Sequence, residues 1–415
     1  MKSRFIKPAL LEKAQAPFGR IIVLTGARQT GKTTLARLSF PEYAYLSIED
    51  PVMRIEYKQL TASQWNLSFP FAILDEVQKA PSLIESIKSV YDQYAAPRYL
   101  LLGSSQLLLL QKVKESLAGR CIILEVFPLT IPEIRTNSWE EKINDSLLLD
   151  VVLRQKDLNG LPSFKLRKDY AERKSAHDFY LQYGGYPALV SEKLDDAGRL
   201  DWLRNYIQTY LERDIRDLAD FRSLEPFVKL QKITALLTGQ LMNYSLLGKE
   251  AGVSSATAKR YLHYLELSYQ VVLLKPWHRN KLKRLVKTPK LHYLDPGVQR
   301  AIVGKTGSLT GHEYESAIVA EIIKQLKNAN FNGDFYHIRT HEGFEVDLLI
   351  ELEDGYFPID VKKTSRVSSK DAKHLRRIGE FLDKPVLAGL VLSEDERPMQ
   401  IEENIYALPA ALFLS

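Results

Sequence analysis

Residues 21–37 read IIVLTGARQTGKTTLAR, and this stretch decides the N-terminal fold. The apolar run Ile21–Leu24 is typical of a buried strand, and Thr34–Arg37 begins a helical stretch. Between them, the segment from Gly26 to Thr33 has the spacing of a phosphate-binding loop, in which two glycines precede Lys and Thr. Glycine permits the tight turn that points backbone N–H groups at phosphate oxygens, and the positive end of the next helix faces the anion.

ATP with Mg²⁺ is the ligand that this loop predicts. Lys32 is expected to reach the β- and γ-phosphates, and Thr33 is expected to ligate Mg²⁺. The alternative is a Gly-rich turn that matches by chance, but the strand before it and the helix after it argue against that. The predicted nucleotide-binding residues are Gly26, Gln29, Thr30, Gly31, Lys32, Thr33, Thr34 and Asp75.

A second apolar run, Phe71–Leu74, ends in two acids. We expect Asp75 to hold Mg²⁺ through water and Glu76 to polarise the water that attacks the γ-phosphate. A strand that ends in Asp-Glu is often only the start of a loop. Downstream of a phosphate-binding loop, however, the pair indicates an ATP-hydrolysing site.

Successive regions of the chain differ in their predicted secondary structure. Residues 20–135 carry short β-rich runs between helical stretches, which predicts a parallel α/β sheet. Helical periodicity dominates from Phe179 to Leu267, and a second, small α/β unit is predicted beyond Gly311. The predicted strands and helices are Ile21–Thr25, Tyr43–Ile48, Phe71–Leu74, Arg98–Leu102, Cys121–Phe127, His312–Leu326 (helix), Phe335–Arg339, Phe344–Glu351, Tyr356–Lys362, Ser369–Leu382 (helix) and Val386–Leu392.

Length and composition limit the number of domains and the classes of partner and compartment that the chain can have. At roughly 150 residues per domain, a chain of 415 residues predicts about three domains. Lys and Arg number 57 against 51 Asp and Glu, a net charge of +6 that points to a polyanion only if the basic residues cluster. The single cysteine, Cys121, excludes an intrachain disulfide. Because a secretory signal and an apolar run of bilayer length are both missing, we expect a cytoplasmic protein with no membrane partner.

The motifs together resemble the AAA+-type P-loop ATPases of bacteria and archaea. More narrowly they are similar to a group whose C-terminal half was labelled a domain of unknown function. The resemblance covers nearly the whole chain. The segments that carry it are GARQTGKT (26–33), LDEVQKAP (74–81), LLGSSQ (101–106), ESLAGR (115–120), YGGYPALV (183–190) and YLERDI (210–215).

This resemblance implies three of the four predicted regions, and the more polar, less regular residues after the ATPase core predict the helical lid or linker. The regions are an ATPase core (1–135), a helical lid or linker (136–220), a winged-helix DNA-binding domain (221–304) and a restriction-endonuclease-like α/β domain (305–415). Arg120 falls where related ATPases carry an arginine that reads the γ-phosphate, in cis or from a neighbouring subunit; a surface arginine is the alternative. Related cores act as rings, so a homo-oligomer, up to a hexamer, is implied.

Residues 246–262 predict a helix-turn-helix. Ser254 or Ser255 is the expected N-cap after a glycine turn. This arrangement leaves Thr257, Lys259 and Arg260 available to contact DNA, although many such units only pack against other helices.

A basic segment follows the helix-turn-helix, between two β-like runs. Residues 275–290 hold seven basic residues and no acid, as expected of a wing hairpin on phosphates. A solvated basic loop is the alternative. The predicted contacts in this segment are Arg279, Lys281, Lys283, Arg284 and Lys287.

Acids in the C-terminal unit predict a second metal site. Asp360 and Lys362 share one face of a strand, because residues i and i+2 do, and Asp347 precedes them. Two carboxylates can hold Mg²⁺ or Mn²⁺, and the lysine can steady a hydroxide. The order is similar to that of PD-(D/E)XK nucleases, in which Glu315 matches a glutamate on the first helix. The alternative is a remnant that binds DNA without cutting it.

The resulting hypothesis is an ATP-dependent ATPase that engages or remodels duplex or branched DNA. This hypothesis includes a metal-dependent nuclease activity of the C-terminal domain. The rival is an ATP-binding signalling or defence switch that acts on a protein partner without processing DNA.

Overall fold

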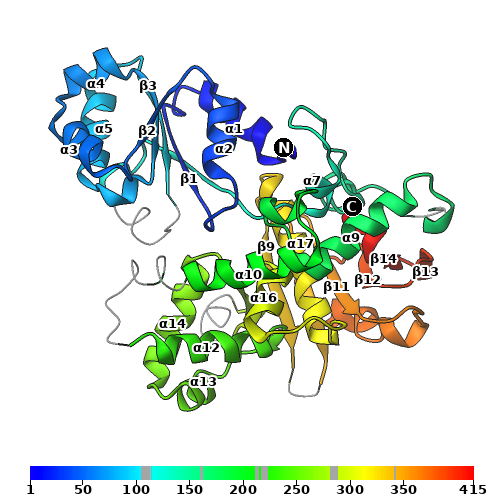
Figure 1. The fold of residues 1–415 in the computed structure, drawn as a ribbon. Coiled ribbons are helices and arrows are strands. Elements are labelled where there is room, and N and C mark those ends of the chain that lie inside the picture. The colour runs from blue at the N-terminus through cyan, green and yellow to red at the C-terminus, as the bar shows by residue number, and fades with distance from the viewer. Residues whose placement is uncertain are drawn as a thin grey trace.

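The computed structural model describes residues 1–103, 113, 115–158, 161, 163–210, 215, 223–280, 288–340 and 343–415. An N-terminal α/β domain stands beside a larger body that contains the central helices and the C-terminal sheet (Figure 1). None of the described helices combines the length and the hydropathy needed to cross a bilayer.

The N-terminal domain is a parallel five-stranded sheet in the order β2-β3-β4-β1-β5, flanked by helices, as the sequence predicts. Its strands are β1 (Ile21–Thr25), β2 (Ala44–Ser47), β3 (Phe71–Asp75), β4 (Arg98–Leu102) and β5 (Ile122–Glu125). Its helices are α1 (Ile6–Gln15), α2 (Lys32–Ser39), α3 (Pro51–Gln59), α4 (Ala62–Ser68), α5 (Ser82–Gln93) and the 3₁₀ turn η1 (Val77–Lys79). The carboxyl ends of β1 and β3 meet at one edge, and this brings the loop after β1 beside the acids after β3.

The middle of the chain is helical. Its elements are α7 (Ile131–Arg135), α8 (Leu147–Arg154), η2 (Phe164–Leu166), α9 (Tyr170–Tyr183), η3 (Pro187–Val190), α10 (Asp196–Tyr210), α12 (Glu225–Leu236), α13 (Tyr244–Ala251), α14 (Ser255–Leu267) and α16 (Pro296–Val303). Helix α13 ends at Gly252, which has a φ of 74°, and α14 begins at Ser254, whose side chain accepts a hydrogen bond from the backbone of Thr257. The predicted helix-turn-helix is therefore present as local structure.

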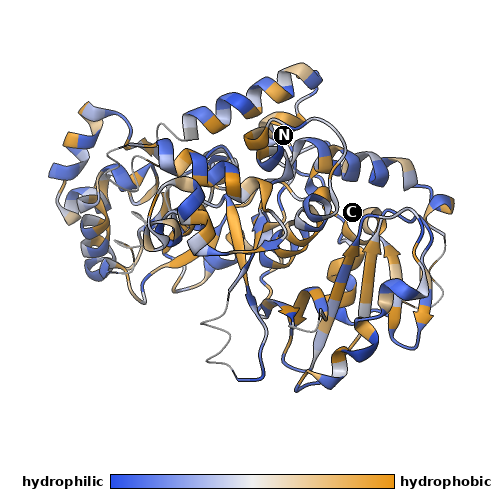
Figure 2. Cartoon of the chain, turned by 90° about the horizontal axis from the view of Figure 1, so that it is seen from below, coloured by the Kyte–Doolittle hydropathy of each residue, from blue (hydrophilic) through white to orange (hydrophobic). Residues whose placement is uncertain are grey.

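The second sheet has nine strands in the order β13-β14-β12-β11-β10-β9-β7-β8-β6. The strands are β6 (Gln240–Leu241), β7 (Val271–Pro276), β8 (Lys290–Tyr293), β9 (Asp334–Arg339), β10 (Glu345–Glu351), β11 (Tyr356–Lys362), β12 (Gly389–Ser393), β13 (Met399–Glu402) and β14 (Ile405–Pro409). Parallel pairing of β7 with β9 makes the sheet continuous across the domain boundary predicted at 304/305. The strands of this sheet are largely hydrophobic (Figure 2).

Helix α17 (Gly311–Asn328) packs on this sheet, and every residue from Glu313 to Leu326 is buried. Its apolar residues belong to one core with α7, α8 and α9 and with strands β10, β11 and β12. A helix that is buried all round belongs to the centre of a protein, and α17 holds that place here (Figure 1).

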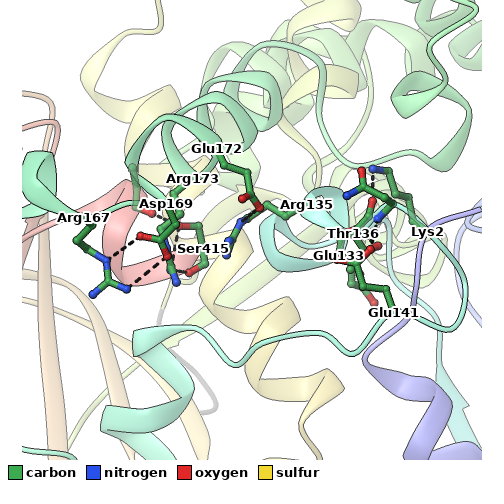
Figure 3. Close-up of polar contacts among 12 residues, drawn as sticks. Lys2, Glu133, Arg135, Thr136, Glu141, Arg167, Asp169, Glu172, Arg173 and Ser415 are labelled. Atoms are coloured by element: carbon green, nitrogen blue, oxygen red, sulfur yellow. Dashed lines mark hydrogen bonds and ion pairs between the residues drawn. The ribbon is translucent and has the colours of Figure 1, made fainter.

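The C-terminal helix α18 (Ala410–Leu414) is fixed to α9 by charged groups (Figure 3). Arg173 donates to the carbonyl and hydroxyl oxygens of Ser415 and pairs with Asp169 at 2.6 Å. Burial acts to raise the pKa of Asp169, but Arg167 and Arg173 outweigh it and hold the pKa well below its usual range.

One predicted helix is wrong. Instead of a helix over Ser369–Leu382, the chain forms two 3₁₀ helices, η5 (Ser369–Ala372) and η6 (Leu375–Glu380). Within η5 and η6 the buried residues are Ala372, Leu375 and Ile378, spaced by three, and this spacing suits the three residues per turn of a 3₁₀ helix. Strands β13 and β14 and helix α18 were not predicted.

Two buried histidines make the second sheet sensitive to acid. Burial lowers the pKa of His292 far below its ordinary value and that of His337 to about 4. The unfolded chain takes up these protons near pH 6.5, so we expect stability to be complete above that pH and to fall between about pH 6.5 and 4. The loss is at most about 1.4 kcal/mol per pH unit per histidine.

Urea unfolding at pH 7.5, 6.5 and 5.5 measures this loss. His292→Leu should give a shallower dependence on pH, whereas His263→Gln, at an exposed position on α14, should match the wild type. An unchanged pH dependence in His292→Leu would show that His292 is not responsible.

Candidate functional site

The phosphate-binding loop lies between β1 and α2, as predicted. Gly26 and Gly31 have φ angles of 146° and 90°, which residues with side chains rarely adopt. A Cβ atom on Gly26 would lie 2.2 Å from the carbonyl oxygen of Val126, so no side chain fits there. Gly31 is the N-cap of α2, whose first N–H groups lack partners within the helix and favour an anion.

Lys32 and Thr30 complete the loop. The Nζ atom of Lys32 donates to the carbonyl oxygens of Gly26 (2.9 Å) and Ala27 (2.8 Å), so the ammonium group is held across the loop. The Thr30 hydroxyl donates to the same Ala27 oxygen at 2.9 Å, and it therefore stabilises the loop itself. Gln29 and Thr34 are exposed at the loop surface.

Thr33 and Asp75 are brought together from α2 and β3. The Thr33 hydroxyl donates to Asp75 Oδ2 at 2.7 Å, and the Tyr45 hydroxyl donates to the same oxygen at 2.8 Å. A hydroxyl beside a carboxylate is a donor set that suits Mg²⁺, so these residues fit the predicted ion. Burial and the bond to Asp75 raise the pKa of Tyr45 to about 12, which keeps it a donor at neutral pH.

Glu76 follows Asp75 in a left-handed conformation, with a φ of 58°. A non-glycine residue there costs free energy, and such costs cluster at functional sites. Gln78 donates to the Glu76 carboxylate from the first turn beyond the strand. The strained backbone thus turns Glu76 out of the strand at the same sheet edge as the loop.

Arg4 holds the loop from outside and was not predicted. Its guanidinium donates to the carbonyl oxygens of Thr30 (2.7 Å) and Phe127 (2.6 Å) and pairs with Glu133 at 3.2 Å. Arg4 is 2% exposed, so these bonds are shielded from water. A lone arginine near the start of the chain carries no motif that could have revealed this role.

A cavity of about 350 Å³ adjoins this arginine. Its walls include Lys2, Arg4, Leu129, Pro187 and Val190. A Cβ atom placed on Gly31 would lie 3.6 Å from Arg4 and 3.9 Å from Pro187, so the cavity neighbours the phosphate-binding loop.

Tyr269 connects the loop to the helix-turn-helix. Its hydroxyl lies 2.7 Å from the Thr25 hydroxyl, at the last residue of β1 before the loop. Tyr269 follows α14 directly, is buried, and has a φ of 60°. Thus one hydrogen bond links the end of α14 to the strand that carries the phosphate-binding loop.

Arg120 lies at the opposite edge of the sheet. It precedes β5, which runs parallel to β1 with Ile122 opposite Ile22, whereas the loop follows the other end of β1. At about 3.3 Å per residue, the five residues of β1 separate the two edges by about 16 Å. Arg120 Nε donates to Asp92 at 2.8 Å. Within one chain, Arg120 therefore does not reach the nucleotide.

The C-terminal acids converge, but around a lysine that was not predicted to be there. Lys290 Nζ lies 2.6 Å from Glu315, 3.0 Å from Asp347 and 3.1 Å from Glu345. Lys290 belongs to β8 and is 1% exposed, so it is not available for the DNA contact expected of the basic segment. Among the described residues, no group of three or more His, Cys, Asp or Glu side chains is arranged to hold a metal ion.

Asp360 and Lys362 lie beside this cluster. Lys362 Nζ is 3.8 Å from Asp360 and 4.0 Å from Asp347. Burial and the nearby Asp347 raise the pKa of Asp360 to about 8. For Asp347, burial acts to raise the pKa, but Lys290 and Lys362 outweigh it and keep the pKa low.

The predicted DNA-contacting residues fall into four groups. Lys259 and Arg260 are exposed on α14. The Thr257 hydroxyl accepts a hydrogen bond from Ser254 at 3.0 Å, so it is engaged in the helix cap. Arg279 is exposed and donates to the carbonyl of Leu382 at 3.4 Å. Lys281, Lys283, Arg284 and Lys287 lie outside the described residues.

Comparison with known protein families matches three consecutive segments. Residues 19–135 match an AAA domain. The chain carries a P-loop ATPase domain. Residues 175–309 and 310–413 match two domains of unknown function, DUF8612 and DUF4143.

Two relatives align with most of the chain. Two uncharacterized proteins, from Mycobacterium tuberculosis and Mycobacterium bovis, are each 26% identical to it over 406 residues, which is 95% of this chain and 81% of the relative. A Walker-type ATPase of Pyrococcus abyssi is 16% identical with a TM-score of 0.46, covering 72% of this chain and 97% of its own. A signal transduction ATPase with a tetratricopeptide repeat sensor from Pyrococcus horikoshii is 11% identical with a TM-score of 0.26, covering 76% of this chain and 44% of its own.

Glu76→Gln should leave ATP binding intact and lower ATP turnover about 100-fold or more, since a positioned general base contributes about 10²–10⁴-fold. Steady-state hydrolysis and binding of a fluorescent ATP analogue measure the two effects separately. Glu85→Gln, an exposed position in the first turn of α5, is the matched control and should behave as wild type. Unchanged turnover in Glu76→Gln would contradict the assignment.

Proposed function

We propose that this P-loop ATPase hydrolyses ATP with Mg²⁺ in order to engage duplex or branched DNA. The observation that carries the proposal is the hydrogen bond between Tyr269 and Thr25. It joins a helix-turn-helix with an exposed basic face to the strand that ends in the phosphate-binding loop.

In the ATPase step, each side chain of the site has a separate role. Lys32 would leave its two carbonyl partners to pair with the β- and γ-phosphates, and backbone N–H groups of the loop would bind the remaining oxygens. Thr33 and Asp75 would hold Mg²⁺, which neutralises charge on the phosphates. Glu76 would orient the attacking water and accept its proton.

The cavity lined by Arg4, Leu129 and Pro187 is our proposed site for the nucleoside. It adjoins Gly31, so a base placed there would leave its phosphates on the loop. Its walls combine apolar side chains with a few polar groups, as in most small-molecule sites.

For DNA, the order of elements supports a winged helix. Helices α12, α13 and α14 alternate with a small sheet in which β8 lies between β6 and β7, and β7 and β8 form an antiparallel hairpin. Lys259 and Arg260 would meet the groove or its phosphates from α14. Arg279 and the basic residues predicted at 281, 283, 284 and 287 would follow the backbone from the hairpin connection.

Arg120 supports an assembly of several copies. It lies at the sheet edge away from its own nucleotide, so it could read a γ-phosphate only in another subunit. A homo-oligomer such as a hexameric ring would place one chain's Arg120 at its neighbour's loop.

For the C-terminal sheet we propose a role in binding DNA rather than in cutting it, because Lys290 stands among the acids that a nuclease would use for metal. The second candidate for the whole protein is a switch in which bound ATP sets the conformation for a protein partner. DNA-stimulated ATP turnover separates the two candidates.

ATP turnover should rise several-fold when duplex, forked or four-way DNA is added, and Tyr269→Phe should reduce that rise while leaving basal turnover unchanged. The reason is that the variant loses only the hydroxyl that bonds Thr25. Tyr264→Phe, on the preceding turn of α14, is the matched control. No stimulation by any of the three DNA structures would favour the protein-partner switch.

Replacing Lys259 and Arg260 together by Glu should weaken DNA binding at least 10-fold at 100 mM salt. It should also lower the slope of log K against log salt by about 2, since each phosphate contact contributes about 1. Fluorescence anisotropy over a salt series gives both values. The same charge change at Lys229 and Lys232, exposed on α12, serves as control; equal losses in both double variants would contradict a specific role for α14.

A further inference from the structure

The ammonium group of Lys290 is surrounded by three carboxylates. A lysine carries three N–H donors and no acceptor. Three carboxylate oxygens, from Glu315, Asp347 and Glu345, lie 2.6–3.1 Å from Nζ. The lysine side chain is 2% exposed, so water does not compete for these bonds. Nζ donates hydrogen bonds to Glu345 and Asp347 and forms an ion pair with Glu315, so three carboxylates surround one positive charge.

A divalent ion at this position would need the same oxygens. Mg²⁺ binds carboxylate oxygens at about 2.0–2.1 Å and Ca²⁺ at about 2.3–2.6 Å. The oxygens of Glu315 and Asp347 that would ligate the ion already lie within 3.0 Å of Nζ. Two cations sharing these oxygens would repel each other at close range, in a site with little water to screen them.

The Lys290 side chain cannot easily leave the cluster of carboxylates. It sits in β8, opposite Leu274 of β7 on one side and Leu241 of β6 on the other. Strand pairing on both sides fixes its backbone, and the side chain is buried between the strand and the acids. The predicted ligands Glu315 and Asp347 therefore do not fit a divalent ion while Lys290 is present.

We infer that Lys290 is a built-in cation that takes the place of a divalent metal and fastens the β7–β8 hairpin to α17 and β10. Glu315, Glu345 and Asp347 then hold the β7–β8 hairpin against α17 and β10 through their contacts with Lys290. The hairpin that leads to the basic segment is thereby held at a fixed position on the C-terminal sheet. This inference goes beyond the proposed function, and its test involves neither ATP nor DNA.

The charged groups around the carboxylate cluster are consistent with the Lys290 ammonium group as its central cation. Glu345 also faces Arg339 at 3.6 Å, and Glu315 faces His312 at 3.8 Å. Lys362 pairs with Asp347 and Asp360 from the open side of the cluster. Removing Lys290 would leave Glu315 and Asp347 buried close to each other with like charge, and that arrangement attracts a metal ion.

Binding of Mn²⁺, followed by isothermal titration calorimetry and electron paramagnetic resonance without nucleotide, tests the inference. The wild type should show no Mn²⁺ site that depends on Asp347. Lys290→Met should gain one Mn²⁺ site, have a lower Tm, and recover part of that Tm when Mn²⁺ is added. Adding Asp347→Asn to Lys290→Met should abolish the gained site.

Lys275→Met, an exposed lysine on the neighbouring strand β7, is the matched control and should gain no site. A Mn²⁺ site in the wild type that is lost in Asp347→Asn overturns the inference, and so does a folded Lys290→Met variant that gains none. If Lys290→Met does not fold, the wild-type titration decides: an Asp347-dependent site overturns the inference, and its absence upholds it.

Discussion

The need to pair charges on a buried helix shapes this protein more than any other constraint. Helix α17 is buried from Glu313 to Leu326, yet that stretch includes several ionisable side chains. A buried charge without a partner costs several kcal/mol, so each must be paired, either within the helix or by another part of the chain. Glu321 and Lys324 pair at 2.9 Å with neither side chain exposed. Glu321 also accepts the backbone N–H of Ile131 at 2.7 Å.

These bonds make α17 the element on which the ATPase domain and the C-terminal sheet meet. The chain leaves β5 and reaches α7, and there Glu321 fixes its backbone at Ile131. Arg4 binds the same segment at Phe127 while it holds the phosphate-binding loop at Thr30. On the other side, Glu315 of α17 binds Lys290 of the hairpin. The phosphate-binding loop, α7 and the β7–β8 hairpin are therefore all connected to α17 through these contacts.

Local sequence was sufficient for the parts of the protein that depend on local backbone geometry. The phosphate-binding loop, the acids after Phe71–Leu74 and the helix-turn-helix were all predicted, since glycine turns, caps and short apolar runs depend on near neighbours. Strand ends shifted by one to three residues. The helix expected over Ser369–Leu382 was wrong because buried residues spaced by three fit a 3₁₀ helix as well as part of a helical pattern. Only the packing against the sheet distinguishes the two.

The sequence by itself determined that a Gly-Lys-Thr loop follows a buried strand, that two acids follow the apolar run Phe71–Leu74, and that basic residues cluster at 275–290. Tertiary structure decided which of these groups meet. It placed Arg120 across the sheet from its own loop, and it joined Arg4 and Tyr269 to the loop from distant positions in the chain. It also turned Lys290 inward among carboxylates. The physical reason is that side-chain partners separated by many residues are set by strand pairing and helix packing, and no local pattern records those contacts.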